Sequence, residues 1–407
     1  MIPRFARPLR HARFRRVWAS QAVSSVGDGI FTIALVGVIL DKHRASDLGF
    51  VLAAESLAMV VVSLLGGVLA DRMRRSRAMV VADLIRIAGV LGFILGAADG
   101  PLVVALLFAA MMGAGAAGFR PAFGALLPSL VPSDELPAAN ALRSITTRAA
   151  SIIGPSLGGL LLAVSNARVA LLVDVATFAI SVFALIGLKD GVPERAESQS
   201  VFQEAKDGLS AVRDRRWVLT VILQGAVQLL LVMGPAVVLL PILLKSRGEF
   251  SAYGVLASLE AVGSVLGGLV AAAWRPVRPG TAAVCALALL GSQLLALALG
   301  LPLYLLGAAV VATGFGYSVF GVLWMSALQQ SIPDELLGRV LSVEMLGTFA
   351  LAPVGLALAP LAIEQLGERP VLVGAFVVLM VSTIVPVLQR DVRTFGGPPR
   401  TRTPNPR

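Results

Sequence analysis

The chain has 407 residues, of which 57% are hydrophobic and 14% are charged, and its mean hydropathy is +0.85. A soluble protein of this length could not bury so much apolar surface, so the composition excludes a soluble protein and predicts a membrane protein. A spanning helix needs about 20 mostly apolar residues. Twelve such runs follow in chain order, at residues 17–40, 48–70, 78–98, 101–127, 140–164, 168–188, 217–244, 251–274, 280–299, 302–328, 338–362 and 370–389. The alternation typical of an outer-membrane barrel is absent from these runs, so the predicted fold is all-α, with twelve transmembrane helices.

The net charge of +10 is distributed unevenly. Most of the 34 Lys and Arg residues fall in the N-terminus, the C-terminus, the central linker and the loops on one side. The opposite loops hold Lys42, Arg44, Arg168, Lys245, Arg247 and Arg369. By the positive-inside rule, both termini are expected in the cytoplasm. The basic surface is expected to face anionic membrane lipids and not nucleic acid.

The first apolar run is long and has no small-residue cleavage site after it, so we interpret it as a retained helix and not a signal peptide. The expected location is the plasma membrane, as a multi-pass protein of a prokaryotic inner membrane. The lone Cys285 excludes an intramolecular disulfide. His11 and His43 flank the membrane without forming a metal-binding cluster, and no cofactor is expected.

Two short segments recur at nearly the same offset. Gly66–Ala70 returns as Gly267–Ala271, 201 residues later, and Val131–Leu136 returns as Ile332–Leu336. Both pairs fall at equivalent points among the twelve runs. The recurrence predicts a parallel 6+6 repeat, which is common among secondary transporters.

The repeat defines the expected domains. These are an N-terminal six-helix bundle (1–188), a cytoplasmic linker with an amphipathic helix (189–216), a C-terminal six-helix bundle (217–390) and a disordered cytoplasmic tail (391–407). The amphipathic helix is expected from Phe202 onward, where apolar residues follow near-helical spacing between charges. An unstructured tether is the alternative for this segment.

The loop after the second run resembles motif A of the major facilitator superfamily, with Arg74 where the motif has Gly. In that family the loop locks the two halves together on the cytoplasmic side. The resemblance therefore implies a gating role for Gly67, Asp71, Arg72, Arg75 and Arg77. The alternative is that the arginines only set topology, but topology alone requires neither the glycines nor the acid.

The fifth run contains Ala150–Gly159, which resembles motif C, the antiporter motif of drug exporters, except that Ala150 replaces its first Gly. The matching residues are Gly154, Pro155, Gly158 and Gly159. The resemblance implies export. The alternative is a generic close-packing face, because small residues four positions apart let helices approach each other.

Further blocks are similar to the drug:proton antiporter branch that holds macrolide-efflux and siderophore-export proteins. They are Phe14–Trp18, Ser24–Gly29, Pro121–Pro128 and Ala139–Leu142. One departure concerns the Arg-containing motif B, which is tied to proton coupling in the family. The corresponding segment Ala109–Gly115 carries no charge.

Ionisable groups within spans are costly and are functional candidates by default. The candidates for proton coupling are Asp28, Glu55 and Glu260, with Asp174 and Glu344 as weaker ones. Asp28 lies about 16 Å along the first run, near the membrane midplane. A structural hydrogen-bonding role is the alternative for each. Arg86 and Arg120 are expected to extend toward the membrane surface or to pair with Asp83.

Polar and aromatic residues in several runs could line a central cavity for an amphiphilic ligand. These candidates are Gln21, Gln224, Gln228, Gln293, Tyr317, Phe320 and Trp324. Packing against neighbouring helices is the alternative for each aromatic residue.

Together these features predict a transporter and not an enzyme. It would export a small amphiphilic or drug-like molecule by alternating access and proton antiport, as a monomer, and contribute to antibiotic resistance. The chain has no P-loop and no paired catalytic acids, so a membrane enzyme or ATP-driven pump is disfavoured. An importer (symporter or uniporter) of the same fold and a transport-inactive sensor or scaffold remain the alternatives.

Overall fold

The computed structural model describes residues 4–70, 73–97, 100–188, 190 and 208–394, and within these ranges the chain is helical with short turns and no strands. Eleven helical segments in this part of the chain are long and apolar enough to cross a membrane. A further 24-residue helix, α2 (Asp47–Ala70), has a C-terminal part whose side chains are not described. The all-α membrane class predicted from the sequence is confirmed.

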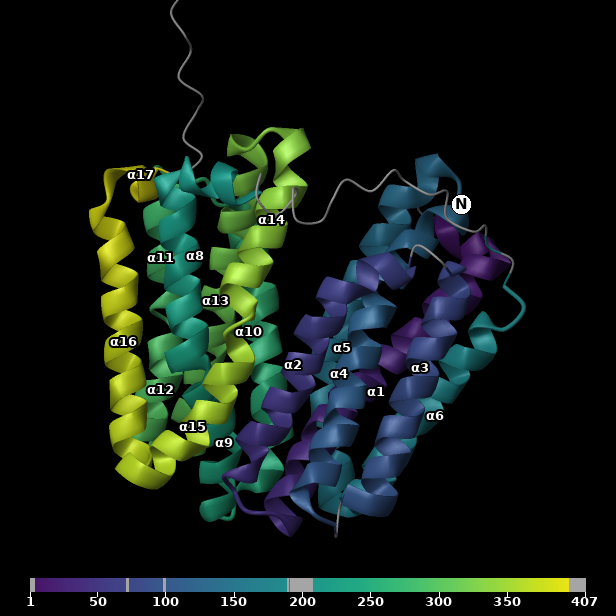
Figure 1. The fold of residues 1–407 in the computed structure, drawn as a ribbon, viewed down its shortest axis with the longest axis horizontal. Coiled ribbons are helices and arrows are strands. Elements are labelled where there is room, and N and C mark those ends of the chain that lie inside the picture. The colour runs from purple at the N-terminus through teal and green to yellow at the C-terminus, as the bar shows by residue number, and fades with distance from the viewer. Residues whose placement is uncertain (1–3, 71–72, 98–99, 189, 191–207, 395–407) are drawn as a thin grey trace, which may run out of the picture. The chain divides into compact units, whose positions relative to one another are not determined.

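Contacts divide the chain into two compact units. The first comprises residues 1–197, 234–261 and 352–368. Its longer helices are α1 (Ala12–Lys42), α2, α3 (Arg75–Gly92), α4 (Leu102–Leu126), α5 (Leu136–Val164), α6 (Ala167–Leu185), α9 (Gly234–Ser246) and α15 (Ala352–Leu366) (Figure 1). The first turns of α10 (Tyr253–Ala273) also belong to it. Short turns complete it: η1 (Arg4–Arg10), the π-helical η2 (Phe93–Ala97), η3 (Leu127–Ser129), η4 (Ser133–Glu135) and η6 (Phe250–Ala252).

The second unit comprises residues 198–233, 262–351 and 369–407. It contains α8 (Arg216–Gln228), the π-helical η5 (Leu229–Met233), the rest of α10, α11 (Pro279–Leu287), α12 (Leu290–Ala298), α13 (Leu303–Ser331), α14 (Asp334–Phe349), α16 (Glu368–Leu388) and α17 (Arg390–Arg393). The tail predicted to be disordered from residue 391 thus begins in α17, and its part from residue 395 lies outside the described residues.

Two predicted spans are interrupted next to prolines. The run 217–244 contains the π-helical turn η5 just before Pro235, and the run 338–362 divides into α14 and α15 just before Pro353. Proline has no N–H to donate to the preceding turn, and it disfavours helical geometry in the residue before it. The run 280–299 also divides, into α11 and α12.

The first unit is built around α1, which packs against α5 on one side and α6 on the other, while α3 packs between α4 and α6. Its apolar core includes Phe14, Met79, Phe119, Leu126 and Leu127, all buried. This packing places one face each of α1, α3, α4 and α6 in a common interior.

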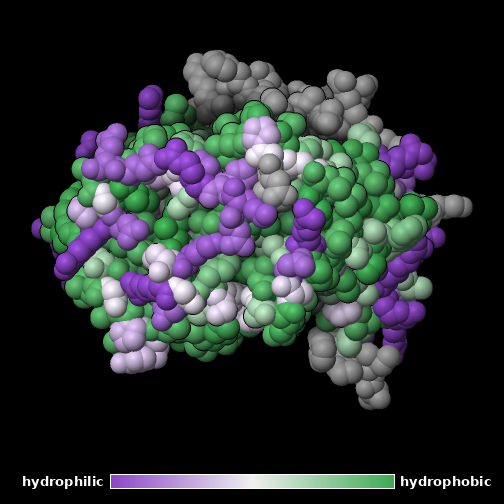
Figure 2. All heavy atoms as spheres, turned by 90° about the horizontal axis from the view of Figure 1, so that it is seen from below, coloured by the Kyte–Doolittle hydropathy of each residue, from purple (hydrophilic) through white to green (hydrophobic). Residues whose placement is uncertain are grey.

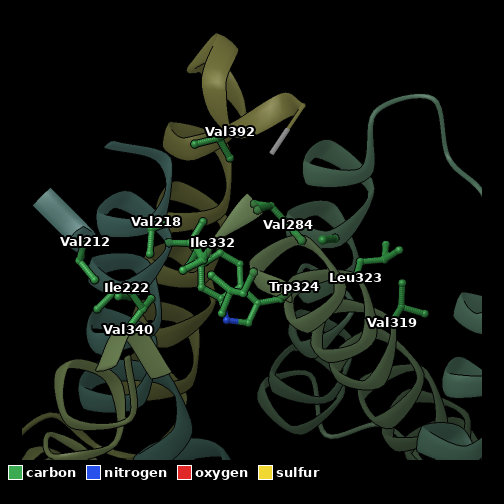
Figure 3. Close-up of a cluster of buried hydrophobic side chains, with 14 of the residues drawn as sticks. Val212, Val218, Ile222, Val284, Val319, Leu323, Trp324, Ile332, Val340 and Val392 are labelled. Carbon is green, nitrogen blue, oxygen red and sulfur yellow. The ribbon is translucent and has the colours of Figure 1, made fainter. Parts of the chain in front are cut away.

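The core of the second unit surrounds Trp324 on α13, whose buried neighbours include Val218, Ile222 and Val340 (Figure 3). Residues 208–213, within the predicted amphipathic linker helix, are helical, and Val212 is buried in this core. Residues 202–207 of the predicted helix lie outside the described part of the chain.

Large apolar side chains remain exposed on many helices, as expected for a protein whose solvent is lipid. Phe183, Leu107 and Ile384 are examples. Figure 2 shows hydrophilic side chains gathered in patches on one end of the molecule, among predominantly hydrophobic ones.

Candidate functional site

An ion pair joins α1 to α3 inside the first unit. The Nη2 of Arg86 donates to Oδ1 of Asp28 at 2.7 Å. The Asp28 side chain is 44% exposed, whereas that of Arg86 is 8% exposed. The pair therefore has one accessible member and one buried member, and a charge-assisted bond in such surroundings is strong.

A second carboxylate lies one turn before Arg86. Asp83 is fully buried, and its Oδ2 accepts a hydrogen bond from Oγ of Ser181 at 2.6 Å. Its Oδ1 lies 3.5 Å from Nη1 of Arg86. The Nε2 of Gln21 donates in turn to Oγ of Ser181 at 2.8 Å. A continuous hydrogen-bonded chain thus runs from α1 through α6 to α3.

A third carboxylate, Asp174 on α6, is also fully buried. Its Oδ1 accepts only a long 3.4 Å contact from Oγ1 of Thr177. Among the described residues, Oδ2 of Asp174 has no hydrogen-bond partner, and neither does Nε of Arg86. The carboxylates of this interior therefore outnumber its guanidinium, and one buried acceptor and one buried donor are unused.

Aromatic rings and glycines shape this interior. The guanidinium carbon of Arg86 lies 4.3 Å from the ring centroid of Phe178 and 5.7 Å from that of Phe119, a cation–π arrangement. Gly115 on α4 leaves space for the Arg86 stem, because a Cβ there would lie 2.5 Å from Cγ of Arg86. Gly27 on α1 likewise leaves space for the Asp174 side chain of α6, because a Cβ there would lie 2.6 Å from Oδ1 of Asp174.

The other predicted proton-coupling residues lie on other helices, although Glu55 is close enough to Asp28 and Arg86 to interact with them electrostatically. Glu55 on α2 is half-buried, and its backbone carbonyl faces Gly113 of α4. Glu260 on α10 is half-buried near Tyr253. Arg86 and Asp83 were not among the residues predicted to function, although two opposite charges three residues apart within an apolar run are a detectable signal. The predicted Asp83–Arg86 pairing is present, but the shorter contact of Arg86 is with Asp28.

The motif C residues form a close helix contact. A Cβ on Gly154 would lie 2.9 Å from Cα of Gly29 on α1, and a Cβ on Gly158 would lie 3.1 Å from Cα of Ile30. On another side of α5, a Cβ on Gly159 would lie 3.3 Å from Cα of Gly254 at the start of α10. Pro155 lies within α5, which continues through it.

Further polar contacts in this unit join residues that are far apart in the sequence. Oγ of Ser156 donates to Oγ of Ser258 at 2.7 Å. Two ion pairs also connect the early helices with the later ones, namely Lys245 with Asp41, and Arg44 with Glu364 at 3.0 Å.

The motif A segment is only partly described, because Asp71 and Arg72 lie outside the described residues. Gly67 lies in the last turns of α2. Arg75 begins α3, and its Nη1 donates to the Ala125 carbonyl oxygen at 2.6 Å, while Arg77 is exposed.

An unpredicted contact lies beside this segment. Asp190, at the start of the linker, accepts hydrogen bonds from the backbone N–H and the Oγ of Ser76, at 2.9 and 2.6 Å. A carboxylate at a helix N-terminus satisfies free N–H groups and complements the helix dipole. Asp190 therefore fixes the linker to the first turn of α3.

The predicted cavity residues are divided between the two units. Gln21 belongs to the chain of bonds described above, whereas the others lie in the second unit: Gln224, Gln228, Gln293, Tyr317, Phe320 and Trp324. Gln228 donates to Ser382 and Thr383, at 3.0 and 3.4 Å. Both polar atoms of buried Gln224 lack a partner among the described residues.

The aromatic candidates pack against each other. The rings of Phe320 and Trp324 are stacked with centroids 6.1 Å apart, and Trp217 meets Trp324 edge-on at 5.6 Å. Trp324 is buried, while Tyr317 is 49% exposed and Gln293 is buried. The structure thus brings Phe320 and Trp324 together and leaves Tyr317 at the surface of its unit.

Comparisons with known proteins agree on the family. The enterobactin exporter EntS of Citrobacter koseri is 28% identical over 416 residues, covering 96% of this chain and 94% of its own. The enterobactin exporter EntS of Escherichia coli O1:K1 is 27% identical over 398 residues, covering 91% of this chain and 92% of its own.

Solved structures share the fold at lower identity. A bacterial homologue of the iron transporter ferroportin, in an inward-facing state, has a TM-score of 0.74 at 16% identity, covering 92% of this chain and 98% of its own. The nucleoside transporter NupG has a TM-score of 0.70 at 13% identity, covering 93% of this chain and 98% of its own. The profile of the Major Facilitator Superfamily matches residues 17–355. This chain is therefore a multi-pass bacterial inner-membrane protein and a transporter, not an enzyme, and it belongs to the Major Facilitator Superfamily.

Proposed function

We propose that this transporter exports a small amphiphilic molecule from the cytoplasm in exchange for protons. The observation that carries the proposal is the exposed Asp28 carboxylate, bound inside the membrane-spanning helices to the buried Arg86. Taking up a proton removes the charge that Arg86 binds, so proton binding at Asp28 changes how α1 and α3 are joined. Arg86 would thus supply the intramembrane arginine that the uncharged segment Ala109–Gly115 lacks.

Two further observations support export. The relatives that align over more than nine-tenths of this chain are named enterobactin exporters, and the close contacts of Gly154 and Gly158 give motif C a physical role in joining α5 to α1. We propose a siderophore-like or drug-like amphiphile as substrate, with Gln224 and the stacked Phe320 and Trp324 as its contacts in the second unit.

The proposed architecture has twelve spans in a 6+6 repeat, with both termini in the cytoplasm and the protein working as a monomer surrounded by lipid. The repeat is supported by matching glycine contacts. A Cβ on Gly113 of α4 would lie 2.0 Å from the Glu55 carbonyl oxygen of α2, and a Cβ on Gly263 of α10 would lie 2.1 Å from the Val311 carbonyl oxygen of α13. These are the second and fourth spans of each half. We further propose that Gly67, Asp71, Arg72, Arg75 and Arg77 form the cytoplasmic gate.

Everted membrane vesicles with an acidified interior test the function. On adding enterobactin or a macrolide, we expect the substrate to accumulate inside and the interior pH to rise as protons leave. Asp28→Asn should abolish both effects, whereas Asp134→Asn, which neutralises an exposed carboxylate in η4, should retain them.

Other outcomes decide against the proposal. Proton-driven accumulation in whole cells would identify an importer. Flux that continues unchanged in Asp28→Asn would remove Asp28 from the coupling. Absence of flux for every compound tested would favour a transport-inactive sensor.

A further inference from the structure

The interior between α1, α3 and α6 contains more carboxyl groups than positively charged side chains that could pair with them. Asp28, Asp83 and Asp174 all act on the guanidinium of Arg86, and Arg120 on α4 is the further positive charge that acts on Asp28. Two of these carboxylates are fully buried, and an unpaired buried charge is far more costly than a neutral group. The cluster therefore favours a state in which one of its carboxyl groups holds a proton.

The hydrogen bonds indicate which group this is. Asp28 accepts the 2.7 Å bond from Arg86, and Asp83 accepts the 2.6 Å bond from Ser181 together with a longer contact from Arg86. Asp174 has only the 3.4 Å contact from Thr177, and its Oδ2 is unpartnered among the described residues. The carboxyl group with the fewest donors is the one that gains most from a proton.

The unused groups are complementary. Within the described part of the chain, Oδ2 of Asp174 is a buried acceptor without a donor, and Nε of Arg86 is a buried donor without an acceptor. Phe178, whose ring lies under the Arg86 guanidinium, is one turn along α6 from Asp174. A rotation of the Arg86 side chain that paired these atoms would satisfy both at once.

We propose that Asp174 is a second proton-binding site of this cluster, and that Arg86 exchanges between Asp28 and Asp174 as one proton moves in the opposite sense. In the observed state Arg86 binds ionised Asp28 and Asp174 holds the proton. In the other state Asp28 holds the proton and Arg86 binds ionised Asp174. Each state has one proton and one ion pair, so the net charge of the cluster stays the same.

The surroundings suit an exchange between these two states. The charged groups that act on Asp174 include Asp28 from α1, and Asp83 and Arg86 from α3. Asp28 also interacts with Arg120 from α4 and Glu55 from α2. Gly27 lets α1 approach α6 closely beside Asp174, and Gly115 on α4 leaves space for the Arg86 stem. The transport role of this exchange rests on the proposed proton coupling at Asp28. By this exchange, the accessible Asp28 would deliver its proton to the buried Asp174.

Infrared spectroscopy of the purified, substrate-free, full-length protein at neutral pH tests the inference. The carbonyl stretch of a protonated carboxyl group is separate from that of a carboxylate and shifts in D₂O. We expect Asp174→Asn to lose one such band. We expect Asp28→Asn to lose the same band, because Arg86 then pairs with Asp174 and displaces its proton. Asp28→Glu and Asp134→Asn should keep it.

Each result decides a separate point. An unchanged band in Asp174→Asn would show that Asp174 is ionised and would overturn the proton site. A band that is lost in Asp174→Asn but kept in Asp28→Asn would overturn the exchange through Arg86. Since Asp28 is partly exposed, its Asn variant remains informative even where Asp174→Asn fails to fold. These spectra need no substrate, so their outcome is independent of the vesicle assay, whose failure would reject proton-coupled export alone.

Discussion

The contact between α1 and α5 predicts the effect of adding one methyl group at Gly154. In Gly154→Ala the new Cβ would lie 2.8 Å from the Val26 carbonyl oxygen and 2.9 Å from Cα of Gly29. Both neighbours are backbone atoms, which cannot rotate away as a flexible side chain can. Ordinary contacts of this kind begin near 3.4 Å, so the two helices must separate by about 0.6 Å.

The separation has two consequences. A gap of about 0.5–1 Å loses a quarter to a half of the dispersion energy between the atoms affected, and overpacking typically costs about 1–3 kcal/mol. Asp28 directly precedes Gly29, and α1 packs between α5 and α6, so the same shift presses α1 toward α6 and disturbs the geometry of the 2.7 Å bond from Arg86 to Asp28. We therefore expect lower stability together with weaker proton coupling.

Thermal unfolding of the detergent-solubilised protein and the vesicle assay measure the two effects. Gly374→Ala on α16 is the matched control, because its Cβ would meet nothing within 4 Å. The control should leave the melting temperature and transport close to those of the wild type. A Gly154→Ala variant with the melting temperature and transport of the control would refute the reasoning, since it would mean that α1 and α5 do not approach as described.

Four further substitutions test separate contacts. Asp190→Asn weakens the cap on α3 and should lower the unfolding free energy by about 0.5–2 kcal/mol, measured by thermal unfolding; no change would show that the linker does not anchor α3. Gln228→Leu removes the amide donor from the hydroxyl oxygens of Ser382 and Thr383 and should lower the unfolding free energy by about 0.5–1.5 kcal/mol. Gln224→Leu should instead be neutral or stabilising while raising the KM for transport, and equal stabilities of the two variants would contradict the assigned bonds. Trp324→Ala should lower the unfolding free energy by about 3–5 kcal/mol. Intrinsic fluorescence during chemical unfolding measures this change, and an unchanged unfolding midpoint would contradict the prediction.

The sequence was sufficient for the fold class because lipid permits few solutions. Runs of apolar residues near the thickness of a bilayer must be helical, and α4, α6 and α16 lie close to their predicted ranges. Interruptions were harder to predict. The break between α14 and α15 lies just before Pro353, but other helices, such as α5 with Pro155, continue through proline. Neighbouring helices decide which prolines interrupt a span, and these contacts are not local in sequence.

The site was only partly predictable for the same reason. Asp28 could be selected by its depth within the first run. The Arg86 side chain was expected to reach the membrane surface or Asp83. It does contact Asp83 but bonds more closely to Asp28, and it is buried because Gly115 leaves space for its stem and Phe178 lies under its guanidinium. Gln21 was expected to line a cavity, and it bonds to Ser181 on α6. In each case the partner is supplied by another helix, which periodicity within a run cannot identify.

The close approach at Gly27 also constrains how the sequence can diverge. A Cβ at this position would lie 2.2 Å from Oγ1 of Thr177 and 2.6 Å from Oδ1 of Asp174. Evolution can therefore enlarge residue 27 only in lineages that also shorten residues 174 and 177. Homologues that keep the buried acid should keep the glycine, and those that enlarge residue 27 should lack the acid. This covariation would separate proteins with the α6 carboxyl group from relatives of the same fold without it.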